Sequence, residues 1–174
     1  MSSSHIVFAK QRDSMDCGPT CLQMIAGYYG KNYSIQNLSQ RCHISSDGVS
    51  LLGISEAAES IGLRATGVKL TWKQMHDEMP LPCIAHWHQT HFIVVYGIKT
   101  KSGKTIIRVA DPALGLIEYD ESTFCKNWQQ SDDTPPHGIA LMLSPTPDFY
   151  KMQENESNSY EKKYGFIHLL KAEF

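Results

Sequence analysis

The spacing of hydrophobic residues changes along the chain, from a helix-like pattern in the first part to a strand-like pattern in the second. Up to about residue 80, apolar residues recur every three or four positions, which is typical of amphipathic helices. Serine or threonine stands where several of these segments begin, and glycine or proline where they end, as helix caps and stops require. The predicted helices cover residues 17–29, 35–42 and 51–61, and a short one opens at Thr71 and stops before Pro80.

The later part of the chain is rich in β-branched and aromatic residues in short runs, which favour strands. Lys101, Ser102 and Gly103 stand between two such runs and predict a hairpin turn. One further helix is expected at residues 121–128, with Asp120 as its cap. The predicted strands are residues 63–70, 83–85, 91–98, 105–110, 116–119 and 138–143. Helices followed by hairpin-linked strands predict an α+β domain with N-terminal helices packed on an antiparallel sheet.

The pattern weakens after residue 145. Residues 153–163 are polar and charged, whereas residues 164–174 regain a short apolar stripe. Polar segments without a core pattern are typical of linkers. We therefore expect one domain over residues 1–145 and a connecting segment over residues 146–174.

Composition excludes several classes of protein. The chain has 174 residues and a formal net charge of −2. Its charge therefore gives no indication that the partner is a nucleic acid or an anionic membrane. It has five cysteines, an odd number at irregular spacing, and no secretory signal pattern at its start. These features predict a reducing, cytoplasmic setting. The sequence contains no apolar run of about 18 residues that would span a membrane.

Cys17 is the leading candidate for a nucleophile. It stands where a loop turns into the first predicted helix, and a helix N-terminus favours a thiolate over a thiol. Pro19 fits the first helical turn. Gln11 lies six residues upstream and offers an amide N–H for a developing oxyanion. Nucleophile and amide donor together predict half of an acyl-transfer site.

A base and an orienting group are available on two neighbouring predicted strands. His91 begins one strand, and Asp111 ends the strand that pairs with it. Groups placed in this way across a hairpin lie within contact range. We expect Asp111 to hold one ring nitrogen of His91 while the other faces Cys17.

Other interpretations of these residues remain open at this stage. His86, His88 and His91 have a spacing that can supply zinc ligands, although no cysteine or carboxylate stands beside them in a ligand pattern. Cys17 and Cys21 resemble a redox motif with one extra residue, and buried cysteines are often inert. Asp111 precedes a proline, as in many turns.

Taken together, these motifs resemble the double-glycine leader peptidases, the papain-like cysteine peptidase domains at the N-terminus of bacteriocin-exporting ABC transporters. The resemblance covers residues 8–145 in the correct order. It rests on Gln11, on Asp-Cys-Gly at residues 16–18, on residues 48–53, on the histidine-rich segment with its strand, and on Asp-Pro-Ala at residues 111–113. Residues 131–137 depart from it, because the family has a short glycine-containing turn there.

The resemblance implies a set of roles. Cys17 would be the nucleophile, His91 the base, Asp111 the orienting group and Gln11 the oxyanion donor. The substrate would be a precursor peptide whose leader binds as an amphipathic helix and is removed after a Gly-Gly or Gly-Ala pair. We expect Val49, Leu51, Leu52 and Ile54 to line the leader groove, with core packing of the third helix as the alternative for each.

The resemblance also implies partners. The peptidase would need no metal or other cofactor, and ATP would act only through a nucleotide-binding domain outside this chain. Transmembrane and ATPase domains of the same transporter would be partners, at the cytoplasmic face of the bacterial cell membrane. Two alternatives remain: a leader-binding domain of an exporter that does not cleave, and a stand-alone papain-like peptidase.

Overall fold

The computed structural model describes residues 5–130 and 132–152 and confirms the α+β class. Helices precede most of the strands in the chain, as the hydrophobic pattern predicts. The elements are α1 (Cys17–Tyr28), α2 (Ile35–Arg41), α3 (Leu51–Ser60), β1 (Leu63–Thr71), α4 (Trp72–Glu78), β2 (Cys83–Trp87), β3 (His91–Lys101), β4 (Lys104–Asp111), β5 (Gly115–Asp120), α5 (Glu121–Trp128), β6 (Gln129–Gln130), β7 (His137–Pro145) and α6 (Pro147–Lys151). No helix among the described residues is long and apolar enough to cross a membrane.

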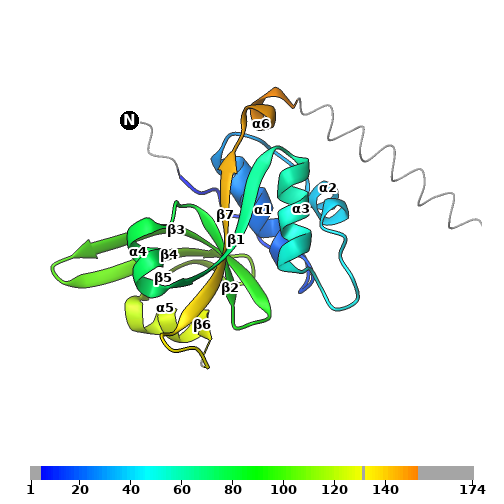
Figure 1. Ribbon diagram of the computed structural model, residues 1–174. Coiled ribbons are helices and arrows are strands. Elements are labelled where there is room, and N and C mark those ends of the chain that lie inside the picture. The colour runs from blue at the N-terminus through cyan, green and yellow to red at the C-terminus, as the bar shows by residue number, and fades with distance from the viewer. Residues whose placement is uncertain (1–4, 131, 153–174) are drawn as a thin grey trace, which may run out of the picture.

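The strands form one antiparallel sheet in the order β1-β7-β2-β3-β4-β5, and β6 pairs with β7 (Figure 1). β1 and β5 are therefore the two edges of this path. β3 begins at His91 and β4 ends at Asp111, so both residues lie at the same end of the sheet. α1 packs on β3, which brings the start of the first helix toward the strand that carries the histidine.

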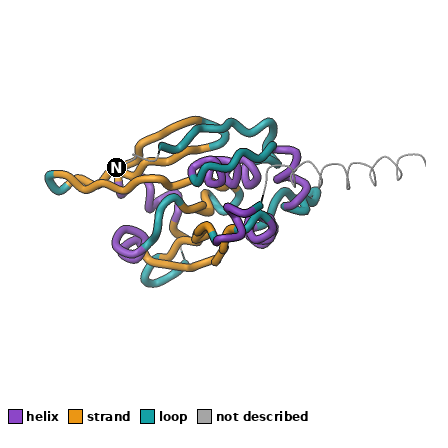
Figure 2. Tube along the Cα trace, turned by 90° about the horizontal axis from the view of Figure 1, so that it is seen from above, coloured by secondary structure: helices purple, strands orange, loops and turns teal. Residues whose placement is uncertain are grey.

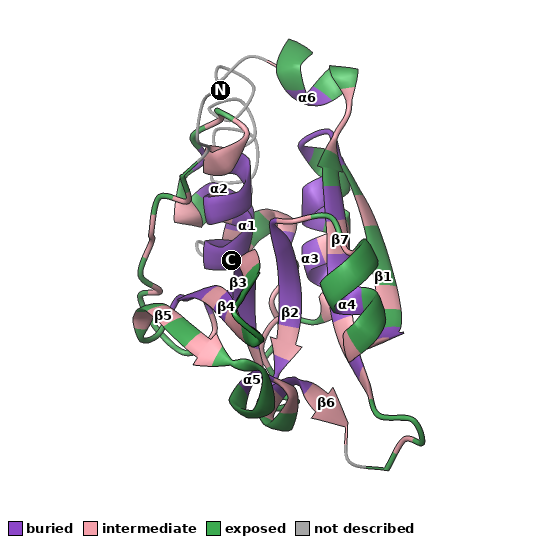
Figure 3. Cartoon of the chain, turned by 90° about the vertical axis from the view of Figure 1, so that its left-hand side faces the viewer, coloured by how far each residue is buried: buried purple, intermediate pink, exposed green. Residues whose placement is uncertain are grey.

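Both faces of the sheet are covered, and each cover encloses its own core. α1, α2 and α3 pack on one face through residues that include Leu22, Ile25 and Ile84. α4 and α5 cover the other face through Met75 and Phe124. Figure 3 shows the middle strands as buried and the outer sides of α4 and α5 as exposed. The second core is the structural reason why strands β2 and β3 are apolar on both faces.

The predicted helix caps are present. Ser34, Ser50 and Asp120 each accept a hydrogen bond from a backbone N–H in the first turn of α2, α3 and α5. Thr71 and Gln74 form a reciprocal capping box at the start of α4. Each cap satisfies a donor that the helix itself leaves unpaired, so these polar side chains fix where the helices begin.

The β3–β4 hairpin is longer than the sequence pattern predicts. β3 continues to Lys101 and β4 starts at Lys104, with Ser102 and Gly103 between them at φ +53° and +75°. Figure 1 shows this hairpin reaching away from α1, α2 and α3, and Figure 2 gives a second view of the same arrangement. The residues near its tip are exposed and polar, so the hydrophobic pattern does not reveal them as strands. The strands there are defined by backbone hydrogen bonds between β3 and β4 and by the two-residue turn that joins them.

The folded region extends beyond the expected boundary at residue 145. Phe149 of α6 is fully buried and packs edge-on against Tyr29. The Thr146 backbone N–H and hydroxyl donate to the carbonyl of Gly62, and Lys31 Nζ donates to the carbonyl of Met152. The expectation of a linker is therefore wrong for residues 146–152. Residues 153–174 lie outside the described residues, and their role as a linker stays a prediction.

Candidate active site

Cys17 is the first residue of α1 and lies almost wholly buried, with 4% of its surface exposed. Gly18 allows the loop before α3 to lie directly on this helix start, because a Cβ at Gly18 would meet Val49 at 2.5 Å and Ile54 at 2.8 Å. The loop at residues 48–50 is thereby held beside the candidate nucleophile.

His91 and Asp111 form the pair that the sequence predicts. His91 Nε2 lies 2.8 Å from Asp111 Oδ1, and the Asp111 side chain is only 3% exposed. The same carboxylate oxygen accepts a hydrogen bond from the backbone N–H of Ala113 at 2.9 Å. The two bonds hold the carboxylate in place, and the ring is oriented with its other nitrogen free to serve Cys17.

The environment of His91 favours its charged form. Burial alone would lower the pKa of His91, but hydrogen bonds with Asp111 and Cys17 outweigh burial and raise the pKa to about 9. For Asp111, burial alone would raise the pKa, but the hydrogen bonds from His91 and Ala113 outweigh it and lower the pKa. The histidine is thus an imidazolium at neutral pH, which places a positive charge next to Cys17.

Gln11 is tied to the same group of residues through its backbone. Its N–H donates to the carbonyl of Pro112 at 2.9 Å, one residue beyond Asp111. The Gln11 side chain lines a cavity of about 540 Å³ together with His91 and Asp111. Its Oε1 is buried without a hydrogen-bond partner among the described residues. The other end of this amide is a donor, which is the group an oxyanion requires.

Asp16 and Arg12 form an ion pair next to Cys17, to which the sequence interpretation assigned no role. Asp16 precedes the nucleophile, is 4% exposed, and pairs with Arg12 Nε at 2.9 Å. Its other oxygen accepts from Ser39 Oγ at 3.3 Å. Arg12 follows Gln11, so the pair connects the loop of the amide donor to the start of α1. In the sequence, the opposite charges of Arg12 and Asp16, four residues apart, could have indicated this ion pair.

The remaining histidines of the cluster, His86 and His88, take no part in the His91–Asp111 hydrogen bond. His86 stacks on Phe92 with ring centroids 5.0 Å apart, and burial lowers its pKa. His88 is exposed in the β2–β3 turn at φ +51°. No group of three or more His, Cys, Asp or Glu within residues 5–130 and 132–152 is placed to hold a metal ion.

Cys21 lies one helical turn beyond Cys17 and is fully buried. Burial first, and then the charges of Cys17 and Asp111, raise the pKa of Cys21 well above its usual value. Both cysteines are free thiols. A thiol held protonated in this way is a poor partner for the exchange that the redox interpretation needs.

The four expected groove residues differ in exposure. Leu52 is 67% exposed, and Val49 and Leu51 are half-buried. Ile54 is fully buried in the core between α1 and α3. The expectation that Ile54 lines a surface groove is therefore wrong, because the helix turns this side chain inward. The structure leaves Val49, Leu51 and Leu52 as candidates.

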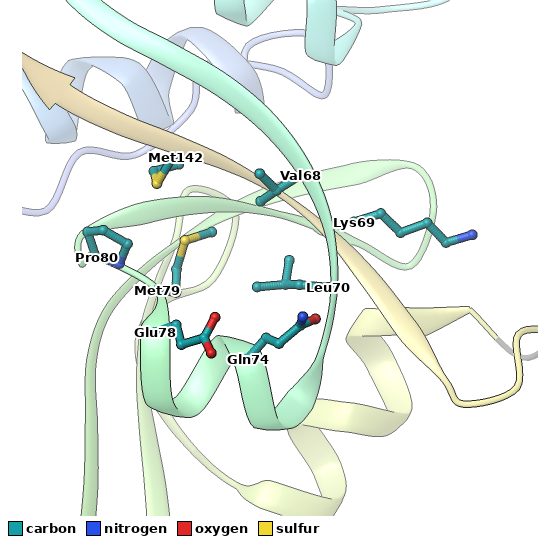
Figure 4. A pocket seen from close by; sticks show the side chains of 8 residues that line it. All are labelled: Val68, Lys69, Leu70, Gln74, Glu78, Met79, Pro80 and Met142. Atoms are coloured by element: carbon teal, nitrogen blue, oxygen red, sulfur yellow. The ribbon is translucent and has the colours of Figure 1, made fainter.

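A second cavity, of about 240 Å³, lies away from these residues. It is bordered by β1, α4 and β7 and is lined by Val68, Lys69, Leu70, Gln74, Glu78, Met79, Pro80 and Met142 (Figure 4). None of the four candidate catalytic residues contributes to it. Of the two cavities, the one lined by His91, Asp111 and Gln11 is therefore the candidate for the site of chemistry.

The part of the chain that carries these residues also matches a known family. The model of the peptidase C39 family matches residues 5–131. The chain belongs to the peptidase C39 family. It is thus a cysteine peptidase domain, a hydrolase, and the expected papain-like α+β fold is confirmed.

Curated relatives of this C39 domain are transport and processing proteins. The chain is 30% identical over 156 residues to the pediocin PA-1 transport/processing ATP-binding protein PedD of Pediococcus acidilactici, covering 87% of this chain and 20% of PedD. It is 37% identical over 146 residues to the lactococcin-G-processing and transport ATP-binding protein LagD of Lactococcus lactis subsp. lactis, covering 80% and 19%. The chain spans about a fifth of the length of these relatives.

Solved structures of similar proteins have the same fold. One is a double-glycine-motif protease from an AMS/PCAT transporter in complex with the leader peptide, with a TM-score of 0.72 and 29% identity, covering 82% of this chain and 94% of that one. Another is the peptidase domain of Streptococcus ComA, with a TM-score of 0.66 and 28% identity, covering 82% and 100%.

Proposed function

We propose that this C39 domain removes the leader from a bacteriocin-like precursor peptide by cutting after a Gly-Gly or Gly-Ala pair. The observation that carries the proposal is the combination of a nucleophile that is 4% exposed with a His91–Asp111 pair beside it. Val49 lies close to Gly18, next to the buried Cys17, so a substrate residue that reaches the sulfur has little room. Glycine has no side chain to collide there, so a glycine pair fits a buried nucleophile.

The proposed reaction has two stages. The Cys17 thiolate attacks the carbonyl carbon after the glycine pair, while the Gln11 amide stabilises the oxyanion. His91 then donates its proton to the leaving amine, and an acyl thioester remains on Cys17. In the second stage His91 takes a proton from water, the water attacks the thioester, and the thiolate is restored. Asp111 holds the ring throughout both stages.

The leader would bind beside α3. Leu52 is exposed, and Val49 and Leu51 are partly accessible, so together they offer an apolar surface next to the nucleophile. An amphipathic helical leader fits such a surface through side chains one turn apart. The solved double-glycine-motif protease was crystallised with a leader peptide, which supports this mode.

The partners of the whole protein follow from its relatives. PedD and LagD are transport proteins with ATP-binding regions, and this chain matches only about a fifth of each. We expect the peptidase to act at the cytoplasmic face of the cell membrane, joined through residues 153–174 to transmembrane and ATPase domains. ATP would then serve export, and cleavage itself would need none.

The test uses the 174-residue protein and a synthetic peptide with an amphipathic leader, a Gly-Gly pair and a short cargo. Mass spectrometry should find one cut, directly after the second glycine. A matched peptide with leucine in place of that glycine should stay intact, and so should the original peptide with the Cys17→Ala protein. Binding of the leader without any cut would support the alternative of a docking domain that does not cleave.

A further inference from the structure

The cavity beside His91 extends well beyond the catalytic residues. Its outer wall is formed by Trp87, Tyr119 and Leu114, and neither Cys17 nor the leader-groove residues line it. Its volume of about 540 Å³ lies in the range of small-ligand pockets and exceeds what catalysis alone requires. The proposed roles of Cys17, His91, Asp111 and Gln11 assign no part of the substrate to this outer region of the cavity.

The direction of the reaction indicates which part of a substrate enters the cavity. The leaving amine takes its proton from His91, so the residues after the cut bond begin on the histidine side. The leader side is at the opposite flank, because Leu51 packs against Gly67 of the edge strand β1. The cavity wall comes from β5, the other edge strand, from the β4–β5 turn, and from Trp87 at the end of β2.

The wall is apolar and firmly supported. The Trp87 and Tyr119 rings are 5.4 Å apart, and Trp87 also contacts buried Phe124 at 5.3 Å. Leu114 is 73% exposed at the rim, although its backbone N–H is fixed by a hydrogen bond to the carbonyl of Asp111. The rest of the lining includes polar residues such as Ser14, His88 and Thr90, so the apolar wall is one side of the cavity. An apolar side chain placed against this wall would cover Leu114, whereas a charged one would lose water there and gain no ionic partner from the three wall residues.

We propose that this cavity, called here the cargo pocket, holds the first cargo residue after the cut bond and prefers an apolar or aromatic side chain there. The inference rests on the proposed function. It adds that cleavage is selective on the cargo side of the bond as well as on the leader side, and it assigns that selectivity to Leu114, Trp87 and Tyr119.

The test separates the pocket from leader recognition. A leader peptide ending in Gly-Gly is supplied as its methyl ester, whose leaving group is methanol, so that no cargo residue is present in the first stage. An added amino-acid amide then competes with water for the thioester. Its amine nitrogen forms a bond to the carbonyl carbon, the C–S bond breaks, His91 accepts the amine proton, and Cys17 leaves as thiolate.

The measured quantity is the ratio of leader–amide product to free leader acid. At equal concentrations, leucinamide and phenylalaninamide should give ratios about tenfold higher than aspartic acid amide. In Leu114→Asp this preference should fall to less than about twofold. Leu116→Asp is the matched control, because Leu116 is 55% exposed on the same hairpin but does not line the pocket, and it should keep the wild-type preference.

The outcomes are distinguishable. Equal ratios for all three amides in the wild-type protein would overturn the cargo pocket while leaving leader cleavage intact. A preference that is unchanged in Leu114→Asp would also overturn it. If the methyl ester is not hydrolysed at all, the proposed function fails, and the pocket inference fails with it.

Discussion

Replacing Asp111 with asparagine should move the alkaline limit of cleavage to lower pH. The substitution keeps the shape of the side chain and removes its charge. His91 Nε2 lies 2.8 Å from Asp111 Oδ1, and the hydrogen bonds with Asp111 and Cys17 raise the pKa of His91 to about 9 despite its burial. An opposite charge at this distance shifts a pKa by roughly one to three units, so we expect a fall of at least about one unit.

The sign follows from the role of His91 as acid. The leaving amine needs the imidazolium form, which is present below the pKa of His91 and is lost as pH rises through it. At pH 8, a pKa of about 9 keeps about 90% of the ring protonated. A pKa near 7.5 would leave only about a quarter. In the variant, kcat/KM should therefore begin to fall more than one pH unit earlier.

The assay is the initial rate of leader cleavage between pH 6 and pH 10, read by chromatography and mass spectrometry. Asp77→Asn is a matched control, because Asp77 contacts His76 at 2.7 Å in a comparable pair on exposed α4. It should leave the profile unchanged. If Asp111→Asn loses rate equally at every pH, with the alkaline limit unmoved, Asp111 does not set the pKa of His91 and the assigned role is wrong.

Three further predictions concern the nucleophile, the oxyanion donor and the C-terminal anchor. Cys17→Ala should abolish cleavage, by several orders of magnitude, while calorimetry shows an intact fold and leader binding persists; residual cleavage would contradict the cysteine mechanism. Gln11→Ala should lower kcat roughly 100- to 1,000-fold with little change in KM, and a pure rise in KM would make Gln11 a binding residue instead. Phe149→Ala should cost about 3–5 kcal/mol in urea unfolding, whereas a chain ending at Met152 should unfold like the whole chain.

The sequence predicted the helices and strands whose ends are determined by residues close by in the chain. The caps at Ser34, Ser50 and Asp120, and the capping box at Thr71, all fix helix starts through hydrogen bonds within one turn. That His91 lies near Asp111 was also predictable, because a hairpin brings the start of its first strand beside the end of its second. The register shift between Val95 and Gly97, which separates this end of the hairpin from its turn, was not predicted.

Features that depend on distant contacts were not predictable in the same way. α6 is only five residues long and is held by contacts of Phe149 and Thr146 with Tyr29 and Gly62, which are remote in sequence. Ile54 has the spacing of a surface residue as well as that of a core residue, and only the close approach of α1 at Gly18 decides between them. The cargo pocket joins residues from the N-terminal loop, from four strands and from the turns between them.

The burial of Cys17 also limits what can inactivate this protein. With 4% of its surface exposed, the sulfur is sheltered from large oxidants and bulky alkylating reagents. A covalent inhibitor would need a narrow warhead on an unbranched arm, with its bulk placed on either side of the catalytic residues. General thiol reagents would then be a poor guide to whether a compound of that shape reaches the site.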